Sequence, residues 1–173
     1  MDTLAGRLLV AGANLLDPNF YRTVVLILEH DAGGAVGVVL NRPSTSGPGD
    51  ELPDWVPLLA EPCVVFVGGP VEPQAAVGLA EGTDGPVLPG VGIVDLSAPP
   101  GELRGPVRVY AGYAGWAPGQ LELELAADGW IVADALPDDV FAAEPDRLWS
   151  TVLRRQPGRT AWLATLPVDP RLN

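Results

Sequence analysis

Lysine is absent from this 173-residue sequence, and cysteine, histidine and methionine each occur only once. The lack of an amine side chain excludes Schiff-base enzymes and Walker-type phosphate loops, which both need Lys. With Cys63 and His30 as the only representatives of their kinds, an intrachain disulfide and the usual Cys/His zinc sites are excluded too. Any Ser-His-Asp or Cys-His arrangement within the chain would have to use His30 itself. We therefore expect no metal site and no cofactor.

Long hydrophobic runs and positive charge are also scarce. No apolar run approaches the ~20 residues that a membrane span needs, and the N-terminal M-D-T-L-A-G-R lacks the layout of a signal peptide. These features predict a cytoplasmic protein without membrane association. The net charge is −12, with 22 acidic residues against ten arginines. Since affinity for nucleic acid rests largely on neutralising phosphates, direct nucleic-acid binding is not expected.

The composition predicts a single folded domain over residues 1–173. Hydrophobic residues make up 47% of the chain, which is enough for a core. The 21 Gly and 19 Pro residues indicate many turns and short elements. Arg154, Arg155 and Arg159 form the only local basic cluster, and a solvated helix end explains such a cluster better than a nucleic-acid patch.

The chain is organised around residues 17–43. Val24 to Leu28 and Ala35 to Leu40 are two apolar runs of strand formers, and residues 30–34 with two glycines join them. This pattern is typical of a β-hairpin. Because the apolar residues are continuous, we expect both faces of the hairpin to be covered and the hairpin to lie in the core.

Other segments predict further strands and a few short helices. We expect strands at residues 7–12, 63–69, 75–79, 91–96, 107–112 and 130–135, a single turn at 19–22, a loop at 43–53, and short helices at 55–60, 118–127, 138–142 and 144–156. Residues 118–127 are ambiguous because Leu and Glu alternate with the period of a strand. Pro118 at the start and Asp128-Gly129 at the end favour a helix.

Three motifs resemble the signature of the YqgE/AlgH family of small bacterial proteins. They are D-P-N-F-Y-R-T-V-V leading to E-H-D-A-G-G-A-V-G-V-V-L-N-R-P, then G-G-P-V at 68–71, and G-Y-A-G-W-A-P-G-Q-L-E-L-E-L at 112–125. The resemblance implies an α/β protein of the α+β type, with a branched mixed β-sheet, a small barrel-like portion and short helices around it. The family has no settled biochemical activity, and its members have been proposed to regulate transcription of alginate synthesis. The family often has a His after G-G-P-V, where this chain reads V-G-L-A.

Three groups of polar residues are candidates for chemistry. Glu29-His30-Asp31 lies at the end of the hairpin, but adjacent strand residues point to opposite faces, so a polar loop explains Glu29 and His30 better than a catalytic dyad. Asn41-Arg42 at the strand exit could clamp a carboxylate or phosphate, or could cap the strand. The third group is Tyr113, Trp116, Gln120, Glu122 and Glu124, where aromatics among glycines favour core or an interaction surface. Cys63 is expected to be buried and inert.

Two functional hypotheses follow. The first is a non-catalytic regulatory or binding module that acts through a protein partner or a small anion, with Asn41, Arg42, Tyr113, Trp116, Gln120 and Glu122 as its binding residues. The second is a hydrolase that uses His30 with Glu29 or a carboxylate from elsewhere in the chain. The scarcity of reactive side chains favours the first.

Overall fold

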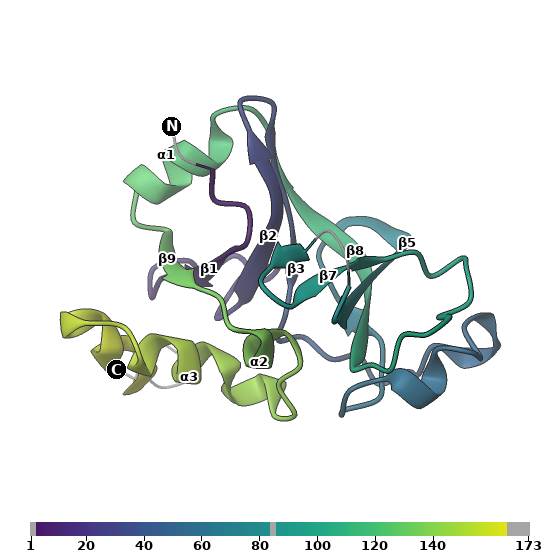
Figure 1. Cartoon of the computed structure of the whole chain (residues 1–173). Helices are drawn as coiled ribbons and strands as arrows, with labels where there is room; N and C mark the ends of the chain where they lie inside the picture. The colour runs from purple at the N-terminus through teal and green to yellow at the C-terminus, as the bar shows by residue number, and fades with distance from the viewer. Residues whose placement is uncertain (1–2, 84–85, 166–173) are drawn as a thin grey trace.

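The expected hairpin lies in the middle of a nine-stranded sheet in the computed structural model, which describes residues 3–83 and 86–165 (Figure 1). Its two strands are β2 (Val24–Asp31) and β3 (Gly34–Val39), which pair antiparallel. β2 extends three residues beyond the apolar run Val24–Leu28, whereas β3 is as long as its run and begins one residue earlier. Glu29, His30 and Asp31 belong to β2, and the turn itself is reduced to Ala32 and Gly33.

The sheet is mixed and branched, as the family resemblance implied. Its strand order is β6-β7-β5-β8-β3-β2-β1-β9, and β4 pairs with β8 outside this path. The remaining strands are β1 (Arg7–Ala11), β4 (Phe66–Val67), β5 (Val71–Glu81), β6 (Pro86–Leu88), β7 (Val91–Val94), β8 (Val107–Trp116) and β9 (Trp130–Asp134). The β4–β8 pair is parallel, and the others are antiparallel.

The expected barrel-like portion does not form a closed barrel within the described residues. The strand path is open, with β6 at one end and β9 at the other. A barrel needs its first and last strands to pair, and these two lie at opposite ends of the path. The sheet instead branches at β8, which pairs with three strands, β3, β4 and β5.

Both faces of the central strands are buried, which explains why their apolar residues are continuous. In β1, Leu8 and Val10 belong to one hydrophobic cluster, whereas Leu9 and Ala11 belong to another. The same division runs through β2, because successive side chains of a strand point to opposite faces. The helix α3 (Leu148–Arg154) covers the first face, and α1 (Gln120–Ala126) lies against the second (Figure 1).

The helices are short, as predicted. The ambiguous segment 118–127 contains the helix α1. The segment 144–156, expected to be helical, contains the 3-10 turn η3 (Pro145–Arg147), which α3 continues. The other short elements are α2 (Pro137–Val140), η1 (Gly49–Glu51), η2 (Val56–Leu58) and η4 (Gly158–Thr165). None of the helices within residues 3–83 and 86–165 has the length and apolar character that crossing a membrane requires.

Two local predictions were wrong. Cys63 is exposed, because the strand expected at 63–69 is reduced to Phe66–Val67 and its first residues lie in a loop. No strand was expected between those at 75–79 and 91–96, but residues 86–88 form the short strand β6. The sequence also predicts a tail at 167–173, and these residues lie outside those that the structure describes.

Candidate functional site

The His30 side chain is almost completely buried, and both of its ring nitrogens are hydrogen-bonded. Its Nδ1 accepts a hydrogen bond from the backbone N–H of Leu4 at 2.9 Å. Its Nε2 lies 2.8 Å from Oε1 of Glu122 on α1. The imidazole is only 3% exposed. His30 therefore joins the segment before β1 to helix α1 across the end of the hairpin.

These two contacts assign the tautomer of His30. A backbone N–H can only donate, so Nδ1 is the acceptor and the ring proton resides on Nε2, which donates to Glu122. A neutral imidazole in this arrangement has no lone pair left for a substrate proton. The Thr3 hydroxyl donates to the His30 backbone carbonyl at 3.0 Å, and not to the ring. The hydrogen bond from His30 also lowers the pKa of Glu122 below its usual range, helped by a backbone hydrogen bond.

Glu29 does not approach His30 with its carboxylate. The two are neighbours in β2, and Glu29 is exposed while the imidazole is buried. With Asp31, Gly33 and Trp116, Glu29 lines a shallow cavity of about 170 Å³ outside the hairpin end. The alternating strand geometry thus separates the proposed acid–base pair, as expected.

Trp116 and Gln120 are held by Glu124, a residue that the sequence analysis did not place among its binding residues. One Glu124 oxygen accepts hydrogen bonds from the indole N–H of Trp116 at 3.1 Å and of Trp130 at 2.9 Å. The other accepts from the side-chain amide of Gln120 at 2.8 Å. Phe20 packs against both indoles, at centroid distances of 6.3 and 5.6 Å. This is an internal junction between α1, β8, β9 and the loop before β2.

Asn41 fastens the end of the hairpin to its beginning. Its Oδ1 accepts the backbone N–H of Val24 at 2.9 Å, and its Nδ2 donates to the carbonyl of Arg22 at 2.9 Å. Arg22 has a positive φ of 56°, a conformation that L residues rarely adopt. The Asn41 amide thus supplies hydrogen-bond partners for two backbone groups at an irregular corner, where regular strand pairing does not supply them.

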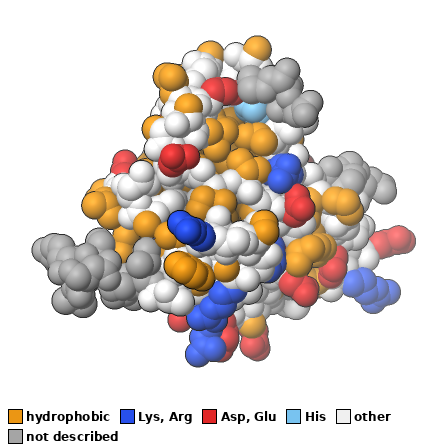
Figure 2. Space-filling model, turned by 90° about the vertical axis from the view of Figure 1, so that its left-hand side faces the viewer, with side chains coloured by type: hydrophobic (Ala, Val, Ile, Leu, Met, Phe, Trp, Pro, Cys, Tyr) orange, Lys and Arg blue, Asp and Glu red, His pale blue; other side chains and the backbone are white. Residues whose placement is uncertain are grey.

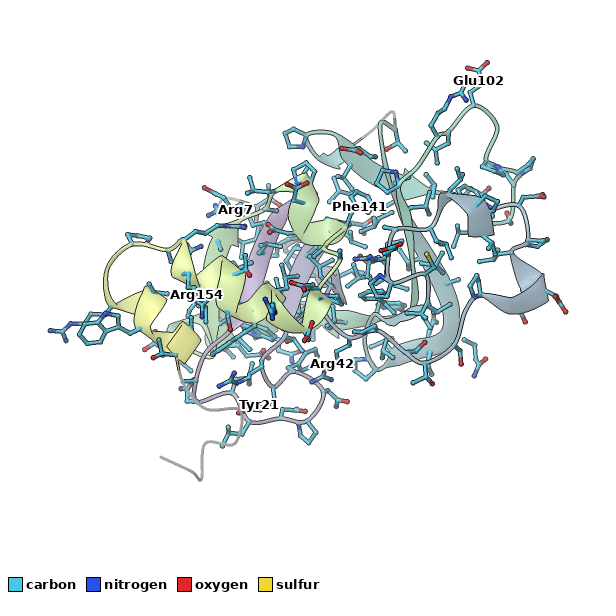
Figure 3. All side chains as sticks on the ribbon, turned by 90° about the horizontal axis from the view of Figure 1, so that it is seen from below. Arg7, Tyr21, Arg42, Glu102, Phe141 and Arg154 are labelled. Carbon is cyan, nitrogen blue, oxygen red and sulfur yellow. The ribbon has the colours of Figure 1, made fainter. Side chains whose placement is uncertain are left out.

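Arg42 uses its guanidinium in the same way. It donates to the carbonyls of Asn19 at 2.7 Å and of Tyr21 at 3.3 Å. Burial of the half-buried guanidinium lowers its pKa, and nearby Asp17 opposes that shift. Asn19, Arg42 and Gly69 also line a cavity of about 60 Å³. Figure 3 shows Arg42 and Tyr21 together beside the helices on the underside of the sheet.

Tyr113 lies where the G-G-P-V motif meets β8. A Cβ atom on Gly69 would fall 2.2 Å from the Tyr113 carbonyl group, and one on Gly68 would fall 2.3 Å from the Gly112 oxygen. Only glycine permits backbones to approach this closely. The G-G-P-V motif therefore packs directly against the third motif. The side chains of Asn41 and Arg42 form hydrogen bonds with other residues of the same chain.

The predicted residues do not converge on one cleft. His30, Glu122, Gln120 and Trp116 surround α1, while Asn41 and Arg42 hold the loop before β2. The cavity beside Arg42 includes neither His30 nor Gln120. In residues 3–83 and 86–165, no three His, Cys, Asp or Glu side chains lie close enough to hold a metal ion.

Sequence reasoning missed a buried arginine. Arg108 on β8 is 1% exposed, and it donates to the carbonyls of Val140, Ala142 and Glu61 at 2.9, 3.0 and 2.6 Å. Its guanidinium lies 4.3 Å from the centre of the Phe66 ring. Burial lowers the pKa of Arg108 and raises that of Tyr110 beside it. A charged residue inside an otherwise apolar strand, V-R-V-Y, was the available signal.

Sequence reasoning also missed a cleft that is larger than the cavities beside Glu29 and Arg42. A cleft of about 910 Å³ lies between the segment around α2 and the outer face of α3. Arg147, Ser150, Thr151 and Arg154 line it from α3 and the turn before it. The available signal was the polar face of the helix expected at 144–156.

Comparison with known proteins agrees with this architecture. Residues 8–161 match the family model described as AlgH-like, DUF179. A UPF0301 protein of Streptomyces coelicolor is 50% identical over 187 residues, covering 100% of this chain and 97% of the relative. A UPF0301 protein of Mycobacterium tuberculosis is 47% identical over 178 residues, covering 95% of this chain and 88% of the relative. The chain belongs to the AlgH-like family.

Two solved structures share the fold. The crystal structure of protein DIP2367 from Corynebacterium diphtheriae superposes with a TM-score of 0.88 at 34% identity, covering 95% of this chain and 93% of the other. The solution structure of the AlgH protein from Pseudomonas aeruginosa gives a TM-score of 0.68 at 26% identity, with coverages of 96% and 98%. The predicted family is confirmed.

Proposed function

We propose that this protein is a non-catalytic binding module that works as one domain in the cytoplasm. In this proposal it has a regulatory role and acts by recognising a small anionic ligand or a protein partner. The observation that carries the proposal is the engagement of both His30 nitrogens, by the Leu4 N–H and the Glu122 carboxylate. His30 is the only imidazole in a chain without lysine, so its structural use leaves few groups for general acid–base chemistry.

The alternative is a hydrolase in which Glu122 orients His30. The distance of 2.8 Å between them suits an orienting carboxylate. Against it, the nitrogen that a nucleophile would need to contact is Nδ1, and the Leu4 N–H occupies it. The Thr3 hydroxyl, which lies beside this site, donates to a backbone carbonyl instead of the ring.

A second observation favours recognition of a protein partner. Large hydrophobic side chains are exposed on several elements, including Leu16 before β2, Leu123 on α1 and Leu136 after β9. Figure 2 shows hydrophobic side chains across the middle of one face of the molecule, with charged side chains between and around them. Protein interfaces commonly combine apolar side chains with polar ones in this way.

A screen of ester, amide, phosphoester and glycoside substrates tests the proposal. Wild type, His30→Gln and Glu122→Gln are compared. The amide that Glu122→Gln introduces retains an oxygen that can accept from His30 Nε2 but has no charge to stabilise an imidazolium. This variant therefore distinguishes a structural acceptor from a catalytic carboxylate. We expect no turnover in any of the three proteins. Turnover by wild type that both substitutions abolish would refute the non-catalytic proposal.

A further inference from the structure

The cleft between α2 and α3 is the region of the described chain most suited to a small ligand. It encloses about 910 Å³ and is separate from the signature residues around His30 and Arg42. Volumes of several hundred Å³ are typical of small-molecule sites. Assigning a ligand class to this cleft deepens the proposed function and rests on its small-anion branch.

Two arginines fix the walls of the cleft. Buried Arg108 donates to the carbonyls of Val140 and Ala142, and so holds the segment after α2 against the sheet. At the other wall, Arg155 donates from both terminal nitrogens to the Asp139 carboxylate, joining the end of α3 to α2. Asp139 is buried, and Ala142, Asp139 and Arg155 all line the cleft. The cleft therefore has defined walls before any ligand arrives.

The wall formed by α3 presents a cationic face with hydroxyl groups. Arg147, Ser150, Thr151 and Arg154 follow the spacing i, i+3, i+4 and i+7, which places them on one side of a helix. Arg147 and Arg154 are about 10 Å apart along the helix axis, at a rise of about 1.5 Å per residue. Their long side chains can therefore reach the same point above the hydroxyls of Ser150 and Thr151. Figure 3 shows Arg154 on this helix, on the underside of the molecule.

The donors on this face are available. Within the described residues, no hydrogen bond or ion pair is formed by the side chains of Ser150, Thr151 or Arg154. Arg147 has one partner, Glu144 at 3.5 Å, and both side chains are about two-thirds exposed or more. Exposed pairs of this kind contribute little and exchange readily for a stronger anion.

The opposite wall carries acceptors. Asp138 lines the cleft from α2, so an anion bound there would be repelled, whereas hydroxyl groups would be accepted. Glu144 lies at the start of η3, beside its partner Arg147. The planar guanidinium fork suits phosphate, and serine and threonine hydroxyls donate to phosphate oxygens. We propose that this cleft binds a phosphate monoester of a polyhydroxylated small molecule. Arg147, Ser150, Thr151 and Arg154 hold the phosphate, and Asp138 accepts hydroxyl groups at the other end.

The experiment is an amide-detected NMR titration of the full chain with inorganic phosphate, glucose 6-phosphate and glucose. We expect saturable shifts at residues 147–154 with both phosphate compounds, tighter binding of glucose 6-phosphate, and no saturable shift with glucose. The contribution of Asp138 is tested with Asp138→Ala, which removes both acceptor oxygens and should weaken glucose 6-phosphate binding without weakening inorganic phosphate binding. The absence of saturable shifts at these residues with both phosphate compounds would overturn the inference.

Matched variants separate local recognition from net charge. Arg154→Gln should weaken phosphate binding by about tenfold or more, because removing one charge-assisted hydrogen bond has an effect of this order. Arg104→Gln removes the same charge from an exposed loop that also carries Glu102, at the far end of the molecule in Figure 3, and should leave the affinity unchanged. Equal weakening by both variants would show a general charge effect and refute the site. His30-dependent turnover, by contrast, would refute the non-catalytic proposal without affecting this result.

Discussion

The side chains of His30 and Glu122 are 92 positions apart in the sequence and 2.8 Å apart in the structure. The buried imidazole also accepts the backbone N–H of Leu4, so one ring connects three segments. An exposed histidine at a hairpin end has ring nitrogens that can take part in chemistry. Both ring nitrogens of His30 are instead hydrogen-bonded, one to the Leu4 N–H and the other to the Glu122 carboxylate. We therefore expect substitution of His30 to lower the stability of the fold.

We expect His30→Ala to lower the free energy of unfolding by about 1–3 kcal/mol, because the Leu4 N–H loses its acceptor and a cavity replaces the ring. Urea unfolding followed by circular dichroism measures the change. Glu29→Ala is the matched control, since it is the exposed neighbour on the same strand and should change stability by no more than about 0.5 kcal/mol. Equal unfolding midpoints for wild type and His30→Ala would contradict a structural role.

The Glu122 carboxylate makes a second prediction, concerning pH. The hydrogen bond from His30 lowers the pKa of Glu122 in the folded state. A carboxylate of this kind stabilises the fold at pH values above its unfolded pKa of about 4.3, and the contribution is lost as the pH falls through the lower folded value. Wild type should therefore be more stable than Glu122→Gln at neutral pH, and the difference should shrink in acid.

Unfolding curves recorded at several pH values from neutral to about pH 3 measure this difference. Glu51→Gln is the control, because Glu51 is an exposed carboxylate in η1 and has no ion pair or side-chain hydrogen bond with the described residues. A stability difference between wild type and Glu122→Gln that is independent of pH would count against the His30–Glu122 hydrogen bond.

The elements that the sequence predicted well are those whose signal is local. The hairpin followed from two continuous apolar runs, and burial of both faces followed from the absence of alternation. Helix α1 was recognised from Pro118 and Asp128-Gly129 although Leu and Glu alternate in it. Strand order and the open path could not be predicted, because β3 and β8 lie far apart in the sequence and no local pattern marks their pairing.

The candidate residues illustrate the same limit at the level of side chains. Asn41, Arg42 and Gln120 were predicted to bind a ligand or partner, and only the fold shows that they also contact backbone carbonyls, backbone amides and Glu124 of the same chain. Arg108 carries no periodic signal that distinguishes a buried cation from a solvated one. Its burial depends on Phe66 and on the carbonyls after α2, which meet it only in the folded chain.

Asn41 gives a third prediction. Asn41→Ala should destabilise the protein by about 1–3 kcal/mol, because the Val24 N–H and the Arg22 carbonyl both lose a partner. Asn41→Asp should be at least as harmful, since it keeps the acceptor for Val24 but places a carboxylate oxygen against the Arg22 carbonyl oxygen. Asn14→Ala, at an exposed position, is the control. Thermal unfolding compares the four proteins, and an Asn41→Asp protein as stable as wild type would contradict the contact to Arg22.

The last prediction concerns Arg108, where two effects oppose each other. Replacing it with Met removes the cost of burying a cation that has only carbonyls and an aromatic ring as partners, and burial indeed lowers its pKa. The same change leaves three carbonyls, of Glu61, Val140 and Ala142, without their donor. An orphaned buried acceptor costs roughly 1–3 kcal/mol. The hydrogen bond to Val140 is buried and those to Ala142 and Glu61 are part-buried, so their combined loss should dominate.

We therefore expect Arg108→Met to lower the free energy of unfolding by about 3 kcal/mol or more, while Arg104→Met, on an exposed loop, changes it by less than about 0.5 kcal/mol. Because Arg108 holds the segment after α2, amide hydrogen exchange should increase at residues 140–143 more than in the distant strand β7. If Arg108→Met is as stable as wild type, desolvation of the guanidinium cancels its three hydrogen bonds. Arg108 would then fix the wall of the cleft without stabilising the fold, and the hydrogen-exchange difference would remain as the measure of that role.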